Sequence, residues 1–218
     1  MIGKPALRRL VKSTMADVLL PIVLASASSA RRQMLEDAGV AFKIDPARID
    51  EGAIRRAIAL SNPAAEPAFV ACELAQAKAL DVSQRHPDAL VIGSDQILNL
   101  GTEILTKSAN EAAARATLTR LRGRTHELHS AVALACNGDI LWADVDRARL
   151  TMRSFSDAFL ESYLAAEGAD LFEAVGAFKL EGRGLQLFET IKGDYFTILG
   201  MPLLSLLGEL RQHNALSV

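Results

Sequence analysis

The 218-residue sequence is poor in cysteine and has no excess of charge of either sign. Its two cysteines, Cys72 and Cys136, lie far apart in apolar stretches, which predicts buried reduced thiols of a cytoplasmic protein and no disulfide framework. A formal net charge of −2 provides no general basic field, so no nucleic-acid partner is implied. No apolar run approaches the ~20 residues that cross a bilayer, so we expect no membrane partner.

The sequence also has no internal repeat, low-complexity tract or linker long enough to separate domains. Half of its residues are apolar, and its length is ordinary for a single α/β domain. Residues 1–16 are basic but have neither the apolar core nor the cleavage pattern of a secretory signal. We expect them to form a disordered tail, or to precede a true start at Met15, a targeting segment being the alternative. The domain is placed at 17–213.

Hydrophobic periodicity predicts alternating strands and helices. The segment 174–187 is rich in glycine and is expected to be irregular. Strands are expected at 18–24, 41–45, 89–93 with an extension to 100, 125–135, 140–145, 148–153, 187–191 and 196–200, and helices at 33–38, 69–82, 109–121, 156–164 and 203–211.

The junction between the first strand and the first helix is a candidate anion site. The apolar run 18–24 is followed by a loop of small hydroxyl residues and then by a helix that carries Arg31 and Arg32. Loop N–H groups, the helix N-terminus and guanidinium forks all suit phosphate oxygens. In the alternative interpretation, Ser28 or Ser29 only caps the helix and the arginines lie in solvent.

Carboxylates and lysines occur at other element ends. Asp95 follows a solidly apolar strand, where open α/β sheets place ligand-binding groups, and it could hold a divalent metal or activate water. Asp50 and Glu51 offer further oxygen ligands. The alternatives are a turn or helix cap at Asp95, a solvated loop at the acidic pair, and ordinary surface positions for Lys78 and Lys107.

Taken together, these anion-binding and carboxylate groups suit metal-assisted hydrolysis of a phosphate ester or phosphoanhydride. The sequence lacks the GxxxxGK[ST] loop of ordinary P-loop enzymes. His126 and His129 are expected to share a strand face and invite a zinc interpretation, but no third ligand has a fitting spacing.

Several short motifs, in order and at fitting spacings over roughly residues 20–211, resemble the Maf family of septum-formation-inhibitor-like nucleoside triphosphate pyrophosphatases. Each motif is weak alone, and the series as a whole is specific. The motifs are Leu24-Ala25-Ser26-x-Ser28-x-x-Arg31, Asp50-Glu51, Leu74-Ala75-x-x-Lys78-Ala79, Gly93-Ser94-Asp95-Gln96, Ile104-Leu-x-Lys107, residues 121–127, Gly176-Ala177-Phe178-x-x-Glu181-Gly182, Phe188-x-x-Ile191-x-Gly193-Asp194-Tyr195 and Gly200-x-Pro202-Leu203.

The resemblance implies an α/β fold with a mixed, strongly twisted sheet around a deep cleft, related to inosine-triphosphate pyrophosphatases, and a homodimer. It implies hydrolysis of a nucleoside triphosphate to monophosphate and pyrophosphate, with Mg²⁺ or Mn²⁺ as cofactor. Asp95 would accept the proton of the attacking water or help to hold the metal, and Glu51 would join the metal and water site. Lys107 completes the implied catalytic group. The implied phosphate-binding residues are Ser26, Ser28, Arg31, Lys78 and Lys107.

Base selectivity depends on three positions of the resemblance. Members acting on 7-methyl-GTP tend to carry glutamine and glutamate where this chain has Gln96 and Glu181, so 7-methyl-GTP is favoured over dTTP or UTP. A carboxylate at Glu181 can accept hydrogen bonds from the guanine edge, which uracil and thymine lack. At the position of Ala30 the family usually has a large side chain, which the resemblance places near the base. An alanine cannot stack on the base. Thr106-Lys107-Ser108 keeps the lysine of the family's Gly-Lys-Pro triplet without its glycine and proline.

Two other function classes stay open on the sequence. A non-catalytic nucleotide-binding regulator of cell division is supported only by the altered first loop. A phosphomonoesterase would release orthophosphate instead of pyrophosphate.

Overall fold

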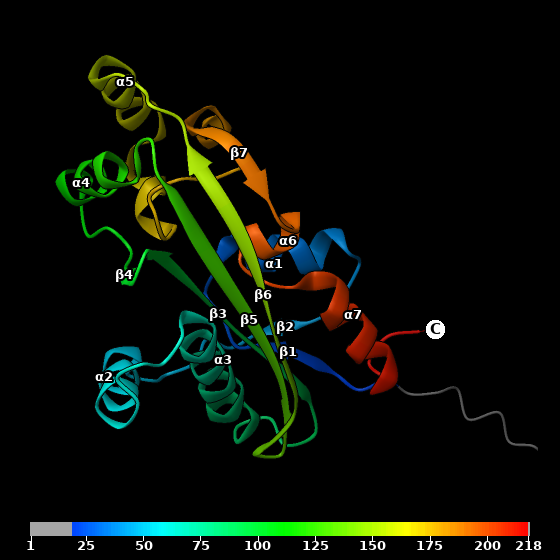
Figure 1. The fold of residues 1–218 in the computed structure, drawn as a ribbon. Helices are drawn as coiled ribbons and strands as arrows, with labels where there is room; N and C mark the ends of the chain where they lie inside the picture. Colours follow the sequence, from blue (N-terminus) through cyan, green and yellow to red (C-terminus); the bar gives the residue numbers. More distant parts are fainter. Residues whose placement is uncertain (1–18, 218) are drawn as a thin grey trace, which may run out of the picture.

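The computed structural model describes residues 19–217 and folds them around one mixed sheet of seven strands (Figure 1). The spatial order is β2-β1-β3-β5-β6-β7, with β4 paired to β3 outside this path. Strand β1 is parallel to β2 and β3, and all other pairs are antiparallel. The expected α/β fold with a mixed sheet is therefore confirmed. The strands are β1 (Ile22–Leu24), β2 (Lys43–Ile44), β3 (Leu90–Leu100), β4 (Glu103–Leu105), β5 (Thr125–Cys136), β6 (Asp139–Met152) and β7 (Phe188–Lys192).

Five of the seven α-helices in residues 19–217 begin where a polar side chain caps the first turn, whereas α3 and α7 have no side-chain cap. Ser28, Asp50, Asn110, Ser156 and Asp194 each accept a hydrogen bond from a backbone N–H of the helix that follows, as helix N-caps do. The helices are α1 (Ser29–Asp37), α2 (Glu51–Ser61), α3 (Pro67–Ser83), α4 (Glu111–Leu121), α5 (Asp157–Glu167), α6 (Tyr195–Leu199) and α7 (Leu203–Gln212), with the 3₁₀ segments η1 (Gly168–Glu173) and η2 (Arg183–Leu187).

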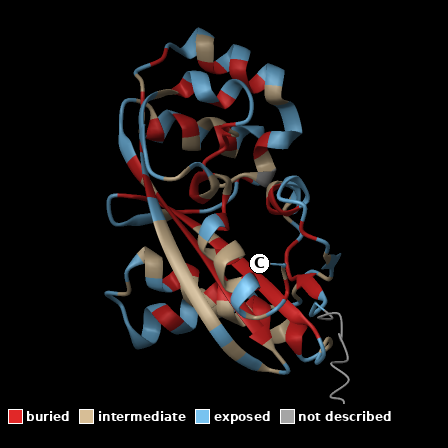
Figure 2. Ribbon diagram, turned by 90° about the vertical axis from the view of Figure 1, so that its right-hand side faces the viewer, coloured by how far each residue is buried: buried red, intermediate tan, exposed pale blue. Residues whose placement is uncertain are grey.

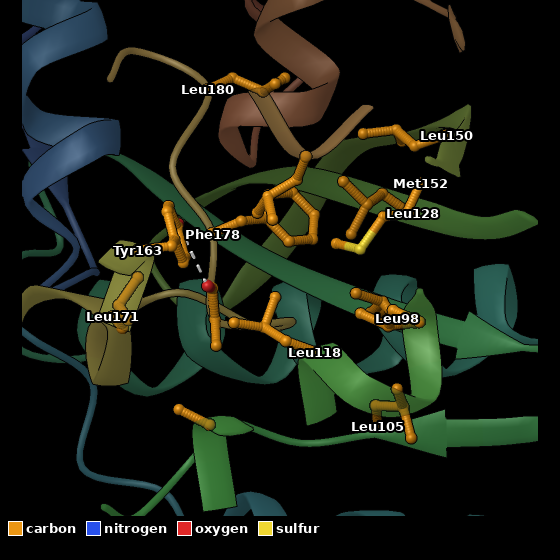
Figure 3. Packing of buried hydrophobic residues seen from close by; sticks show 14 of the residues in the cluster. Leu98, Leu105, Leu118, Leu128, Leu150, Met152, Tyr163, Leu171, Phe178 and Leu180 are labelled. Carbon is orange, nitrogen blue, oxygen red and sulfur yellow. Dashed lines mark hydrogen bonds between the residues drawn. The ribbon is translucent and has the colours of Figure 1, made fainter. Parts of the chain in front are cut away.

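Both faces of the sheet are covered, as the buried residues in Figure 2 indicate. Helix α3 packs on one face against Ile97, Ala131 and Ala133, while α1 and α7 pack on the other against Val132 and Leu134. This alternation along β5 follows from the two-residue period of a strand. A third apolar cluster (Figure 3) joins α4, α5 and the 168–187 segment to the far end of the β5–β6 pair.

A glycine allows α3 to approach β3 closely. A Cβ atom on Gly93 would lie 2.2 Å from the carbonyl oxygen of Ala75 and 2.8 Å from the Cβ of Ala79. Because Lys78 lies between these two alanines and Asp95 lies two residues beyond Gly93 on the same strand face, the close approach brings the lysine and the aspartate together.

Two sequence predictions of secondary structure are wrong. Residues 196–200 form helix α6 and not a strand, because Asp194 caps the segment and Gly200, at φ +118°, ends it. The runs 140–145 and 148–153 are not separate strands but parts of β6, which pairs with β5 from Asp139 to Thr151 with one register shift.

The expectations for the cysteines and the N-terminus have different outcomes. Cys72 and Cys136 are free, as predicted, but they are only half-buried. The predicted tail at 1–16 lies outside the described residues. Within residues 19–217, no helix has both the length and the apolar character needed to cross a membrane.

Candidate active site

A cleft of about 670 Å³ opens along the C-terminal side of β1 and the middle of β3. It is lined by residues 25–31 (the β1–α1 loop and the first turn of α1), the 46–49 loop, the first turns of α2, Lys78 of α3, the 105–107 segment, the 174–181 segment and the end of α6. The structure brings all ten predicted site residues to this one cleft: Ser26, Ser28, Ala30, Arg31, Glu51, Lys78, Asp95, Gln96, Lys107 and Glu181.

The two arginines in the first turn of α1 have different environments. Arg32 lies in solvent and pairs with Glu36, as the alternative interpretation expected, and Ser28 caps α1. Arg31 is buried, and its guanidinium donates to the carbonyl oxygens of Gly200 and Ser94, both at 3.0 Å. A third bond of 3.3 Å reaches the hydroxyl of Ser26. Arg31 is therefore a fixed positive charge beneath the loop.

Lys78 joins two carboxylates at the floor of the cleft. Its Nζ lies 2.6 Å from Oδ1 of Asp95 and 2.7 Å from Oε1 of Glu51. Burial raises the pKa of Glu51, but the hydrogen bond and charge of Lys78, with two nearby guanidinium groups, lower it below its ordinary value. Lys78 is thus not an ordinary surface lysine, and Glu51 is held ionised at neutral pH.

The second oxygen of Asp95 is available to a ligand. Oδ2 is buried and accepts no hydrogen bond, although a buried carboxylate oxygen normally has a partner. Residues 19–217 contain no group of three or more histidine, cysteine or acidic side chains placed to hold a metal. Mg²⁺ commonly binds one or two carboxylates and completes its shell with substrate phosphates and water. Asp95 and Glu51 fit that requirement.

Positive charge predominates in the cleft although the whole chain has a net charge of −2. Five cationic and three anionic side chains line it, which gives a net charge of +2 (5 − 3). Burial lowers the pKa of Lys107, and the like charges of Arg31 and Lys78 lower it further. These groups therefore favour a polyanionic ligand. The cations are Arg31, Arg55, Lys78, Lys107 and Lys179, and the anions are Glu51, Asp95 and Glu181.

Gln96 is bound to helix α6. Its Nε2 donates to the carbonyl oxygens of Thr197 (3.2 Å) and Ile198 (3.0 Å) and to Ser130 Oγ (3.0 Å). Since these contacts take up the amide donors, the group that Gln96 can offer a ligand is its carbonyl oxygen. Glu181, in contrast, is exposed at the cleft.

Sequence reasoning missed Arg55 and Phe178 of the cleft lining. Arg55 lies four residues after Glu51, so the two share a helix face, and locating α2 from Glu51 onward would have identified it. The expectation that His126 and His129 share a strand face is wrong, because three positions separate them. The His126 ring packs against Phe178 and Phe188 on one face, while His129 lies beside Glu127 on the other.

Comparisons with known sequences find relatives over most of this chain. The family model described as "Maf-like protein" matches residues 21–213. A 7-methyl-GTP pyrophosphatase of Rhizobium etli is 48% identical over 191 residues, 88% of this chain and 95% of that protein. A nucleoside triphosphate pyrophosphatase of Rhodopseudomonas palustris is 50% identical over 198 residues, 91% and 96% of the two chains. Among solved structures, a HAM1 protein from Coxiella burnetii has a TM-score of 0.41 and 18% identity, covering 63% of this chain and 75% of that one.

Proposed function

Since this chain belongs to the Maf family, we propose that it is a nucleoside triphosphate pyrophosphatase, which converts a nucleoside triphosphate to the monophosphate and pyrophosphate. The observation that carries the proposal is the Lys78 bridge between Asp95 and Glu51, in a cationic cleft where Asp95 Oδ2 accepts no hydrogen bond. This arrangement provides a carboxylate that can activate water, next to cationic side chains that can bind phosphates.

The chemical step uses the chain's own groups as follows. The carboxylate of Asp95 orients a water molecule toward the α-phosphorus and takes its proton, while the water oxygen bonds to phosphorus. The bond between that phosphorus and the α–β bridging oxygen breaks, and pyrophosphate leaves. Arg31 and Lys107 offset the charge that accumulates on the phosphates. A divalent ion held by Asp95 and Glu51 would supply further charge neutralisation when bound.

For the base, 7-methyl-GTP is the favoured substrate. Gln96 and Glu181 are the residue types that the resemblance associates with it, and several relatives at 47–48% identity carry that name. Glu181 can accept the N1–H and amino protons of guanine, which a uracil or thymine base does not offer. Other relatives, at 47–50% identity, are named for nucleoside triphosphates in general, so dTTP and UTP are the alternative.

Three further features are part of the proposal. Mg²⁺ or Mn²⁺ is the cofactor, supported by the open oxygen of Asp95. The two free cysteines suit a reducing compartment, which supports a cytoplasmic location. The proposal of a homodimer is based on the family resemblance. Light scattering after gel filtration would test it by measuring the molar mass in solution.

The test of substrate is hydrolysis of 7-methyl-GTP, GTP, dTTP and UTP with Mg²⁺ or Mn²⁺, with pyrophosphate and orthophosphate assayed separately. We expect pyrophosphate release that is fastest with 7-methyl-GTP. Faster release from dTTP or UTP would keep the reaction and contradict the base assignment. Nucleotide binding without turnover of any of them would favour the non-catalytic regulator.

A further inference from the structure

Arg55 faces the two carboxylate oxygens that Lys78 does not use. Its Nη2 lies 3.4 Å from Oε2 of Glu51 and 3.9 Å from Oδ2 of Asp95. Lys78 holds the other oxygen of each carboxylate, Oε1 and Oδ1. Each carboxylate therefore has one oxygen on the lysine and the other directed toward the arginine.

The two cations are held very differently. Lys78 makes contacts of 2.6 and 2.7 Å, as expected for a charge-assisted bond, whereas the Arg55 contacts are longer than such bonds normally are. Arg55 Nε is also buried without an acceptor. The Arg55 side chain is 29% exposed, lines the cleft and has a long flexible stem. Its guanidinium is thus held by one long hydrogen bond to Glu51 and lies beyond hydrogen-bond distance of Asp95.

A divalent cation would need the oxygens that Arg55 faces. Mg²⁺ binds carboxylate oxygens at about 2.0–2.1 Å and tolerates no second cation at the same lone pairs. With Oδ1 and Oε1 on Lys78, the remaining ligands are Asp95 Oδ2 and Glu51 Oε2. The guanidinium and the metal therefore exclude one another at this position.

We propose that Arg55 occupies the divalent-cation position of the substrate-free protein and yields it when metal and nucleotide bind, turning its guanidinium to the phosphates. In this role Arg55 is a positioning residue: it compensates the buried carboxylate of Asp95 and the half-buried carboxylate of Glu51 until the metal arrives. The inference rests on the proposed function for the identity of the cation and of the phosphate ligand.

The test is Mn²⁺ binding in the absence of nucleotide, measured by titration calorimetry on the full chain. Arg55→Ala should bind Mn²⁺ about tenfold more tightly than the wild type, the size of effect that one neighbouring charge has on an ionisable group. Arg55→Gln keeps the side-chain length but loses the charge and should show the same increase. In a steady-state assay, both variants should have a raised KM for the triphosphate.

Arg56→Ala is the matched control. Arg56 is the next residue of α2, has the same charge, is 72% exposed and pairs with Asp50 at 3.9 Å, away from the site. Its removal should leave Mn²⁺ affinity within about twofold of the wild type, since exposed charges are screened.

Each outcome decides the matter. Equal affinities in Arg55→Ala, Arg55→Gln and Arg56→Ala would overturn the inference, as would absence of Mn²⁺ binding in all of them, even if the wild type releases pyrophosphate. A gain confined to the Arg55 variants would support the inference even if no nucleotide were hydrolysed. The inference and the proposed function can therefore fail separately.

Discussion

Among the buried polar residues, His126 has no hydrogen-bond partner on either ring nitrogen. It is 1% exposed and packs against the rings of Phe178 and Phe188, with centroids 5.6 and 6.0 Å away. Burial lowers its pKa from 6.5 to about 4. The imidazole is therefore neutral at pH 7 and packs as part of an apolar cluster, and Phe178 also lines the cleft.

This environment makes folding stability depend on pH. Between pH 6.5 and about 4 the unfolded chain binds a proton at His126 that the folded chain does not, so stability falls as the pH is lowered through this range. At pH 5 the loss from this group is about 2 kcal/mol. His126→Phe should remove that part of the pH dependence while remaining at least as stable as the wild type at pH 7.5, measured by urea unfolding at both pH values.

His213→Gln is the control for the histidine prediction, because His213 is 31% exposed on its side chain at the end of α7. It should keep the wild-type difference between pH 7.5 and pH 5. If His126→Phe also kept that difference, the neutral buried state of His126 would be refuted.

At the scale of elements, α6 is a short helix whose carbonyl end holds side chains of the site. The carbonyl oxygens of Thr197 and Ile198 accept from Gln96, and that of Gly200 accepts from Arg31. Thr197 Oγ1 also donates to Asp146 on β6 at 2.7 Å. Because a five-residue helix is marginal by itself, its cap and these contacts decide whether it forms.

Removal of the α6 cap should weaken the site. Asp194 accepts from the N–H groups of Phe196 (2.9 Å) and Thr197 (3.2 Å). Asp194→Ala should cost about 1 kcal/mol of unfolding free energy and reduce kcat/KM by roughly fivefold. Asparagine is an equally good cap, so Asp194→Asn should restore both values. A loss of kcat/KM in Asp194→Asn as large as that in Asp194→Ala would mean that Asp194 acts through its charge and not as a cap.

The close packing of α3 on β3 should be disrupted by a Cβ atom at Gly93. Gly93→Ala places a Cβ 2.2 Å from a backbone oxygen, so we expect a loss of about 1–3 kcal/mol and lower activity as Lys78 moves away from Asp95. Gly208→Ala on α7 meets nothing within 4 Å and should raise stability by about 0.5–1 kcal/mol. Urea unfolding of both variants measures this, and equal stability of the two would refute the close-packing argument.

At the scale of the whole molecule, local patterns predicted most of the helices and strands. The ten site residues could be placed together because a family resemblance linked motifs far apart in the chain. Local patterns did not predict α6, whose β-branched and aromatic residues favour a strand until the Asp194 cap and Gly200 are considered. Nor did they predict Arg55, whose importance arises from a contact with Asp95 forty residues away.

The long-range contacts also explain why single motifs were ambiguous. Ser28 caps α1 while the neighbouring Ser26 bonds the buried Arg31, so the structural and ligand-binding interpretations of this loop are both partly right. The burial of Arg31 depends on Gly200, near the other end of the chain. Such pairings depend on tertiary packing, which no local pattern contains.

The central claim is that Asp95 activates water for pyrophosphate release, and one measurement tests it most directly. Wild type and Asp95→Asn are compared with 7-methyl-GTP and Mg²⁺, with pyrophosphate and orthophosphate assayed separately and nucleotide binding measured in parallel. We predict pyrophosphate and monophosphate in equal amounts from the wild type, and a rate about 10²–10⁴-fold lower in Asp95→Asn with nucleotide binding retained. Orthophosphate as the first product, or an undiminished rate in Asp95→Asn, would contradict the account.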